Sequence, residues 1–210
     1  MKNMNKSIYF YQNGFTLLEL ILASFIFSTI TAGVVIFSLY YLNNYSFSLE
    51  ANQAISIAQQ NITRMVREIR EARSADDGAY TLAQTDDNTI VFYSDVTNDG
   101  RTDRVRYFLN GTQLMKGIIE PTDVPVTYPL ANEKLTIVSD YVDLLSHSLF
   151  TYYNSAWPGD TINNPLAAGQ RILNTRYISV YIRINIQNNS GATPFELTSG
   201  VHIRSLKDNL

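Results

Sequence analysis

A lone carboxylate, that of Glu19, lies within a long apolar run that extends from Phe15 to Leu42. The run follows Gly14 directly and contains no proline and no other charged residue. Its 28 residues exceed the roughly 20 that a helix needs to cross a bilayer. An unpaired carboxylate in a membrane costs about 3 kcal/mol, so we expect a cation to pair with Glu19. The nearest basic residues, Lys2 and Lys6, precede the run, which indicates a partner from outside this helix.

A second group of oxygen-bearing residues has the spacing of a calcium loop. Its first nine positions would take oxygens from Asp95, Thr97, Asp99, the main chain of Arg101, and Asp103. The twelfth position is Arg106, a cation where a bidentate glutamate belongs, and the segment falls between two predicted strands rather than two helices. A polar hairpin turn at Asn98-Asp99-Gly100 is the alternative, and the sequence favours it.

Other residues with chemical potential give weaker signals. Tyr152, Tyr153 and Trp157, followed by Pro158-Gly159, form an aromatic, turn-rich patch that could contact a partner or a surface. The two histidines, His147 and His202, fall in strand-like runs, and the chain has no cysteine, which disfavours a multi-ligand zinc site. The sequence contains no phosphate-binding loop and no nucleophile elbow. We therefore expect neither an enzyme nor an organic cofactor.

The elements that must position these residues begin with a helix over about residues 15–73. Ile55, Ile62, Met65, Val66 and Ile69 share one face of its second half. No proline or glycine interrupts residues 34–77, and Asp76-Asp77-Gly78 is expected to end the helix. The arginines at 64, 67, 70 and 73 drift around the helix, so a solvated face with Arg64–Glu68 and Arg67–Glu71 pairs is favoured over a nucleic-acid surface.

Beyond Gly78 the pattern becomes that of short antiparallel strands. The strands are expected at residues 79–84, 89–94, 104–109, 112–119, 134–139, 147–153, 177–187 and 195–204. The clearest alternates Ile178, Val180 and Ile182 with polar residues, which is typical of a half-buried strand. Asn110-Gly111 predicts a tight hairpin. The sequence thus predicts an α+β fold, in which a long N-terminal helix packs on an antiparallel sheet head.

The segment Gly14-Phe15-Thr16-Leu17-Leu18-Glu19-Leu20 resembles the processing signature of type IV prepilins and type II secretion pseudopilins. The resemblance implies that a prepilin peptidase cuts between Gly14 and Phe15 and methylates the new amino terminus. It further implies that the Phe15 amine of one subunit pairs with Glu19 of a neighbour. A secretory signal peptide would have a shorter apolar run followed by its cleavage site. A plain membrane anchor would not need Glu19, although a carboxylate near the helix start could reach toward water.

The resemblance also divides the chain. Residues 1–14 would be the leader, 15–42 the transmembrane and polymerisation half of the helix, 43–75 its amphipathic half, and 76–210 an extracytoplasmic head. The segments 62–70 and 195–206 resemble the larger minor pilins and the J-type pseudopilin. Many major pilins carry a proline about two-thirds along the membrane segment, where this chain has Ile36 and its neighbours, with Gly33 nearby.

Charge orients the chain and limits its partners. Lys2 and Lys6 precede the run and the next basic residue is Arg64, so the positive-inside rule leaves the N-terminus in the cytoplasm. The net charge is −3, and removal of the leader takes away two of the 16 basic residues and no acid, which leaves −5. This balance counts against general binding to nucleic acid, because such binding depends on basic residues. The strip Arg101, Arg104 and Arg106 leaves a local contact open.

The expected function is that of a minor type IV pilin-like subunit in or at the tip of a filament. Its partners would be other pilins, the peptidase and an inner-membrane assembly platform, and the chain would begin as a single-pass precursor in the bacterial cytoplasmic membrane. One alternative is a pseudopilin of a type II secretion system. The other is a binding module, either a competence pseudopilin that aids DNA uptake or an adhesin.

Overall fold

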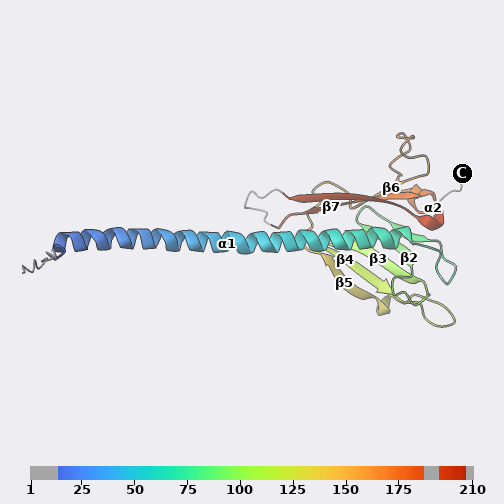
Figure 1. Ribbon diagram of the computed structural model, residues 1–210. Coiled ribbons are helices and arrows are strands. Elements are labelled where there is room, and N and C mark those ends of the chain that lie inside the picture. The colour runs from blue at the N-terminus through green and yellow to red at the C-terminus, as the bar shows by residue number, and fades with distance from the viewer. Residues whose placement is uncertain (1–13, 187–193, 207–210) are drawn as a thin grey trace, which may run out of the picture. The chain divides into compact units, whose positions relative to one another are not determined.

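The computed structural model describes residues 14–186 and 194–206, and the predicted leader lies almost wholly outside them. The chain divides into two compact units, Met1–Glu50 and Ala51–Leu210. One helix, α1 (Leu17–Arg70, 54 residues), belongs to both units. The predicted α+β class is confirmed, with a long N-terminal helix followed by antiparallel strands (Figure 1).

The second unit holds the C-terminal part of α1 against two sheets. Ile62, Met65, Val66 and Ile69 are buried along one face of the helix, as their spacing predicts, whereas Ile55 is only half-buried and Ala58 is buried in addition. The helix ends at Arg70, three residues before the predicted end. A competing hydrogen bond explains the earlier end. The backbone N–H of Arg73 donates to the carbonyl oxygen of Tyr93 at 2.9 Å instead of to a carbonyl oxygen one turn back in the helix.

The larger sheet has five antiparallel strands in chain order, and each strand pairs with the next. The strands are β1 (Leu82–Thr85), β2 (Thr89–Ser94), β3 (Asp103–Asn110), β4 (Gln113–Ile119) and β5 (Lys134–Ser139). A short 3-10 helix, η1 (Leu130–Asn132), precedes β5. The predicted hairpin is confirmed with a shift of one residue: Asn110 pairs with Gln113, and Gly111, at a φ of 60°, supplies the left-handed turn.

A separate sheet of three antiparallel strands was not anticipated by the sequence. It consists of β6 (Phe150–Tyr153), β7 (Tyr177–Ile184) and β8 (Phe195–His202) in chain order. Two short helices, η2 (Ala168–Gln170) and α2 (Arg171–Asn174), precede β7, and η3 (Arg204–Leu206) follows β8. The strand prediction for His147 was wrong: this residue lies in the turn before β6, whereas His202 lies in β8 as expected.

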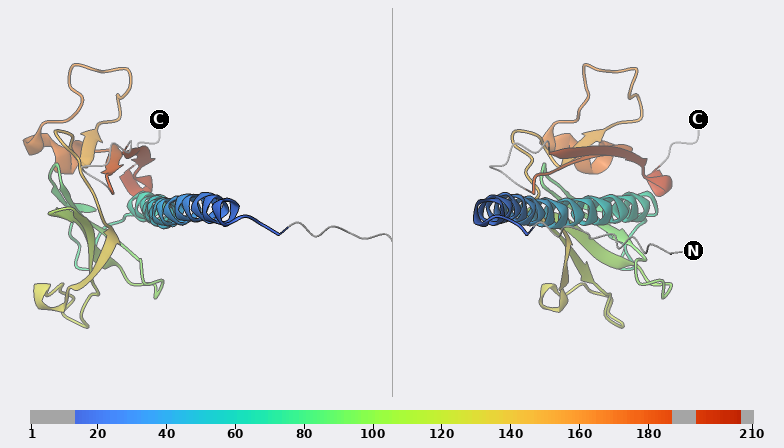
Figure 2. Two further views of the ribbon diagram at one scale, coloured as in Figure 1. Left: turned by 90° about the vertical axis from the view of Figure 1, so that its left-hand side faces the viewer. Right: turned by 60° about the vertical axis from the view of Figure 1, so that its left-hand side comes forward.

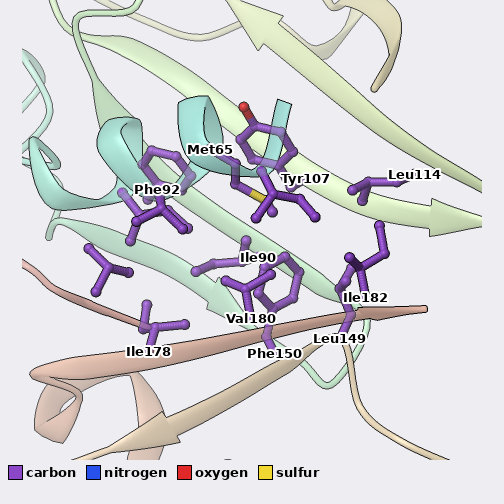
Figure 3. Close-up of a cluster of buried hydrophobic side chains, with 14 of the residues drawn as sticks. Met65, Ile90, Phe92, Tyr107, Leu114, Leu149, Phe150, Ile178, Val180 and Ile182 are labelled. Carbon is purple, nitrogen blue, oxygen red and sulfur yellow. The ribbon is translucent and has the colours of Figure 1, made fainter. Parts of the chain in front are cut away.

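The core of this unit is shared by the helix and both sheets. Met65 of α1, Phe92 and Tyr107 of the larger sheet, and Phe150 and Val180 of the smaller sheet belong to one buried cluster (Figure 3). The two sheets lie on different sides of the C-terminal part of α1 (Figure 2). The smaller sheet contributes the alternate residues of β7 that the sequence predicts, Ile178, Val180, Ile182 and Ile184.

A charged cluster is buried where α1 meets the larger sheet. The Glu68 side chain is only 7% exposed, and its Oε1 lies 2.7 Å from the Nζ of Lys116 on β4. The Tyr107 hydroxyl, from β3, donates to Oε2 of Glu68 at 2.6 Å. Arg64, one turn earlier in the helix, completes the cluster, because its Nε lies 3.1 Å from Oε1 of Glu68. The expectation of a solvated Arg64–Glu68 pair is therefore wrong for Glu68, because β3 and β4 cover it.

Burial changes the ionisation of both sheet partners. Removal from water lowers the pKa of Lys116, and the hydrogen bond from its ammonium to Glu68 opposes this effect. Burial, followed by the charge of Glu68, raises the pKa of the Tyr107 hydroxyl. Tyr107 therefore stays protonated and remains a hydrogen-bond donor to the carboxylate.

We expect Lys116→Met to destabilise the protein by about 3 kcal/mol, because it leaves the buried Glu68 without its main cation. The double variant Glu68→Gln, Lys116→Met is expected to recover much of this loss, since neither charge is then stranded. Urea unfolding of the full chain in detergent measures both free energies.

The matched control is Arg64→Met, which removes the other cation of the cluster. Its side chain is 58% exposed, so the expected cost stays below about 1 kcal/mol. Equal costs for Lys116→Met and Arg64→Met would contradict this account of the cluster.

Candidate functional site

The first candidate site lies where α1 begins. Gly14 is exposed, with no atom within 4 Å of the position that a Cβ would take, and the Phe15 side chain is 89% exposed. The Gly14–Phe15 bond thus stands in an open stretch of chain that directly precedes the helix. A peptidase needs access of this kind to the bond that it cuts.

Thr16 and Glu19 form a reciprocal cap on the first turn of α1. The backbone N–H and the hydroxyl of Thr16 both donate to Oε2 of Glu19 at 3.0 Å. In return, the backbone N–H of Glu19 donates to the Thr16 hydroxyl at 3.3 Å. This is a capping box, which satisfies N–H groups that a helix start otherwise leaves without partners.

The cap gives Glu19 a partner that the sequence analysis missed. The sequence predicts a cation from outside the helix, whereas within the chain the carboxylate accepts hydrogen bonds from Thr16. The signal was present, since a threonine followed three residues later by a glutamate is the capping-box pattern. The cap consists of neutral donors and brings no cation to the carboxylate, so pairing with the Phe15 amine of a neighbouring subunit stays a prediction.

The residues after the cap are suited to lipid. Leu17–Leu42 is long and apolar enough to cross a membrane, with a mean hydropathy of 2.4. Hydroxyl groups inside this stretch bond to the helix's own carbonyl oxygens one turn back, as Ser24 does to Ile21 and Thr31 to Phe27. Such bonds matter because a bilayer core offers no water to polar groups.

The second candidate site, the loop from Asp95 to Asp103, links β2 to β3. Both carboxylate oxygens of Asp95 accept backbone N–H groups, from Asp99 at 3.2 Å and from Gly100 at 3.1 Å. The Asp99 carboxylate accepts the N–H of Arg101 at 2.8 Å. These bonds are those of a polar turn, with Asn98 and Gly100 at positive φ.

Asp103 holds the start of the same loop. Its Oδ2 accepts the backbone N–H groups of Val96 and Thr97 and the Thr97 hydroxyl, at 3.0–3.1 Å. Its Oδ1 is buried and has no hydrogen-bond partner among the described residues. Burial raises the pKa of Asp103, against the lowering effect of the Thr97 and Val96 bonds.

The loop does not gather its acids into a metal cage. Within residues 14–186 and 194–206, no three or more His, Cys, Asp or Glu side chains are grouped so that they could hold a metal ion. Thr97 and Asp103 contact each other, as do Asp95 and Asp99, but these contacts serve the turn. Calcium binding by this loop stays a prediction of the sequence.

The remaining sequence candidates are occupied by other contacts. Arg101 lies 3.4 Å from Asp123, and Arg106 forms an ion pair with Glu133 at 2.5 Å and lies over the Phe108 ring. Two of the three arginines in the predicted basic strip, Arg101 and Arg106, thus lie beside acids. His147 packs against Tyr181 and His202 against Tyr177 in tilted ring pairs, with centroids 4.7 and 4.8 Å apart.

One comparison with known protein families matches the N-terminal site. Residues 10–35 match the family described as the prokaryotic N-terminal methylation motif. The matched stretch contains Gly14, Phe15, the Thr16–Glu19 cap and the first part of the apolar helix. No curated protein matches the chain in sequence.

We expect the pH dependence of stability to reveal the buried Asp103. Because its pKa is raised in the folded state, folding favours its protonated form, and the stability that protonation adds grows as pH falls. Asp103→Asn removes this gain, so the wild type should become more stable relative to the variant between about pH 7 and about pH 4. Urea unfolding across this range measures the difference.

The control is Asp99→Asn, which makes the same chemical change at an exposed carboxylate of the same loop. An Asp103→Asn curve that runs parallel to the wild-type curve at every pH would contradict the buried-acid interpretation.

A calcium titration of the full chain tests the loop directly. We expect the melting temperature to stay unchanged at millimolar calcium, because the loop carboxylates already serve backbone N–H groups. A rise in melting temperature that is lost in Asp95→Asn would establish the calcium site instead.

Proposed function

We propose that this chain, a precursor of the type IV prepilin and pseudopilin family, is a minor type IV pilin-like subunit. After cleavage and N-methylation it would be packed into, or at the tip of, a thin filament. The observation that carries the proposal is the capped Glu19 at the start of an apolar helix, directly after the Gly14–Phe15 bond and inside the matched motif.

The geometry supports a defined sequence of events. Cleavage at Gly14–Phe15 would create an amine on Phe15, two residues before α1 begins at Leu17. The cap holds the Glu19 carboxylate in place, with the side chains around it exposed. A carboxylate in lipid is tolerable when paired and costly when alone, so a neighbour's amine would favour assembly only after processing.

A role as a minor rather than a major subunit has separate support. α1 is continuous from Leu17 to Arg70, and no proline interrupts it. The membrane-segment proline of many major pilins would be a point where the helix loosens. The charge of the processed chain also supports a structural role over DNA binding, since Arg101 and Arg106 are paired with acids.

We expect Glu19→Ala to leave cleavage intact and to reduce incorporation into filaments by about tenfold or more, because the neighbour's amine loses its anion. Mass spectrometry of the membrane-extracted protein is expected to find an N-methylated Phe15 as first residue in both proteins. Sheared filaments, probed by immunoblot, measure the incorporation.

Thr16→Val is the matched control, because it removes the hydroxyl of the cap and retains the carboxylate. It should incorporate far better than Glu19→Ala. Normal incorporation of Glu19→Ala, or a native protein that begins at Met1 or at some bond other than Gly14–Phe15, would overturn the proposed function.

A further inference from the structure

Four aromatic rings form a continuous row on the outer face of the smaller sheet. The ring centroids of Trp157 and Tyr153 lie 4.5 Å apart, those of Tyr153 and Tyr177 5.6 Å, and those of Tyr177 and His202 4.8 Å. Tyr153, Trp157 and Tyr177 are half-buried, and His202 is exposed. Neighbouring rings are tilted against each other by 35°, 60° and 55°, and each keeps part of its surface open to the surroundings. We call these four residues the aromatic row.

Strand register builds three members of the row. Tyr153 of β6 pairs directly with Tyr177 of β7, and Tyr177 pairs with His202 of β8. In β7 the neighbouring Ile178 points into the core, so Tyr177 points away from it. Directly opposed side chains on one face of a sheet lie within contact distance, which fixes the order of the rings.

Gly200 gives Tyr177 its place over β8. A Cβ atom at Gly200 would lie 1.8 Å from the Tyr177 hydroxyl oxygen and 2.4 Å from the ring carbon that bears it. The tyrosine ring thus extends across the neighbouring strand in a space that any side chain at position 200 would fill.

Trp157 comes from a loop whose base is fixed. Asn154 and the buried Asn164 close this loop with two hydrogen bonds of 2.9 Å: the backbone N–H of Asn154 donates to Oδ1 of Asn164, and Nδ2 of Asn164 donates to Oδ1 of Asn154. A third bond joins the Asn164 amide to the Asp160 carbonyl oxygen at 3.0 Å. The loop stands away from the sheets between β6 and α2 (Figure 2). The tryptophan is therefore preorganised, which reduces the entropy lost on binding.

A cavity of about 370 Å³ lies where β6 ends and β7 begins, and its lining residues flank the row in the chain without including any of its four rings. Its polar lining is almost entirely neutral and consists of Asn154, Ser155, Asn163, Gln170, Asn174 and Arg176. Asn154 directly follows Tyr153 and Arg176 directly precedes Tyr177, so the cavity lies at the same ends of β6 and β7 as these two members of the row. Each amide offers both a hydrogen-bond donor and an acceptor.

We propose that the aromatic row and this cavity form a binding site for a neutral saccharide chain. A sugar ring has an apolar face of C–H groups, which packs on an aromatic face, and a rim of hydroxyl groups, which suits amide side chains. A row of several rings matches a ligand that repeats along its length. This site goes beyond assembly of the filament and does not depend on it.

The charge of the surroundings selects the saccharide over other ligands that stack on rings. Single-stranded nucleic acid also stacks on aromatic side chains, but it needs cations along its phosphate backbone. In the described row and cavity the only basic side chain besides His202 is Arg176, which donates to the carbonyl oxygens of Leu173 and Thr175. An apolar protein partner would leave the amide groups of the cavity without hydrogen bonds.

The test exploits Trp157, the one tryptophan of the chain, whose fluorescence reports on this site alone. The full chain is extracted in a detergent without a sugar head group and titrated with cellohexaose, chitohexaose and maltohexaose. Polygalacturonate and a thymidine oligonucleotide are the charged comparisons. We expect at least one neutral hexasaccharide to shift the emission at millimolar concentration or below, and the charged polymers to leave it unchanged.

Variants locate the binding in the row. Calorimetry should find the Kd raised about tenfold or more in Trp157→Ala and in Gly200→Ala, where the new methyl group displaces Tyr177. Asn174→Ala should also weaken binding, through the cavity. Tyr181→Ala is the matched control, because this tyrosine lies on the same face of β7 but stacks on His147 outside the row. It should bind as the wild type does.

Three outcomes would overturn the proposal: no response to any neutral hexasaccharide, a response to the oligonucleotide alone, or equal losses in Trp157→Ala and Tyr181→Ala. Melting curves of each variant identify those that fail to fold, and Asn174→Ala decides if Trp157→Ala is among them. The assay uses unassembled protein, so its result is separate from that of filament incorporation.

Discussion

The buried carboxylate of Glu68 is the contact that seats the helix on the larger sheet. It brings together Lys116, Tyr107 and Arg64, which come from three different elements. Apolar packing alone allows a helix to slide or rotate with small losses, because Ile62, Met65 and Ile69 could be replaced at the interface by similar neighbours. A buried charge allows no such exchange. In any other register Glu68 or Lys116 would be buried without a partner. The pair therefore fixes one position of α1 on the larger sheet, although burying both charges costs free energy of desolvation. The cluster lies outside the membrane-suited segment and is independent of it.

A single helix is here suited to two different solvents, and its sequence changes between its two halves. Between Leu17 and Leu42 the side chains are apolar on every face, and the hydroxyl groups bond back to the helix's own carbonyl oxygens. Beyond Ala58 the apolar residues narrow to one stripe, and charged residues cover the rest. Each half carries one carboxylate that cannot be left unpaired, Glu19 in the first and Glu68 in the second. Glu68 pairs with Lys116 of the same chain, whereas among the described residues Glu19 accepts hydrogen bonds only from the neutral donors of Thr16. This difference is the physical reason to look for assembly at Glu19.

Sequence patterns predicted those features that depend on neighbours along the chain. The long apolar run, the helical stripe around Met65, the alternation in β7 and the hairpin at Gly111 are all local, and all are confirmed. The misses share a different cause. The burial of Glu68 depends on Tyr107 of β3 and Lys116 of β4, which follow it by 39 and 48 residues. No local sequence pattern around Glu68 predicts that Lys116 will be its partner. The division of the strands between two sheets likewise depends on which strands pair. An antiparallel strand has the same alternating sequence pattern whichever sheet it joins. The Thr16–Glu19 cap was local and could have been found from its spacing.

The aromatic row illustrates how register turns dispersed residues into a surface. Tyr153, Tyr177 and His202 are separated by more than twenty residues at each step, and each alone is an ordinary outward-facing residue of a strand. Their alignment follows once β6, β7 and β8 pair in the observed register. Gly200 adds evidence of a different kind. A glycine inside a strand costs stability and packs poorly, yet here its missing side chain is the space that Tyr177 occupies. Gly200 therefore lowers the stability of the smaller sheet at the position where the Tyr177 ring crosses β8. A function for the arrangement of the rings would account for this loss of stability.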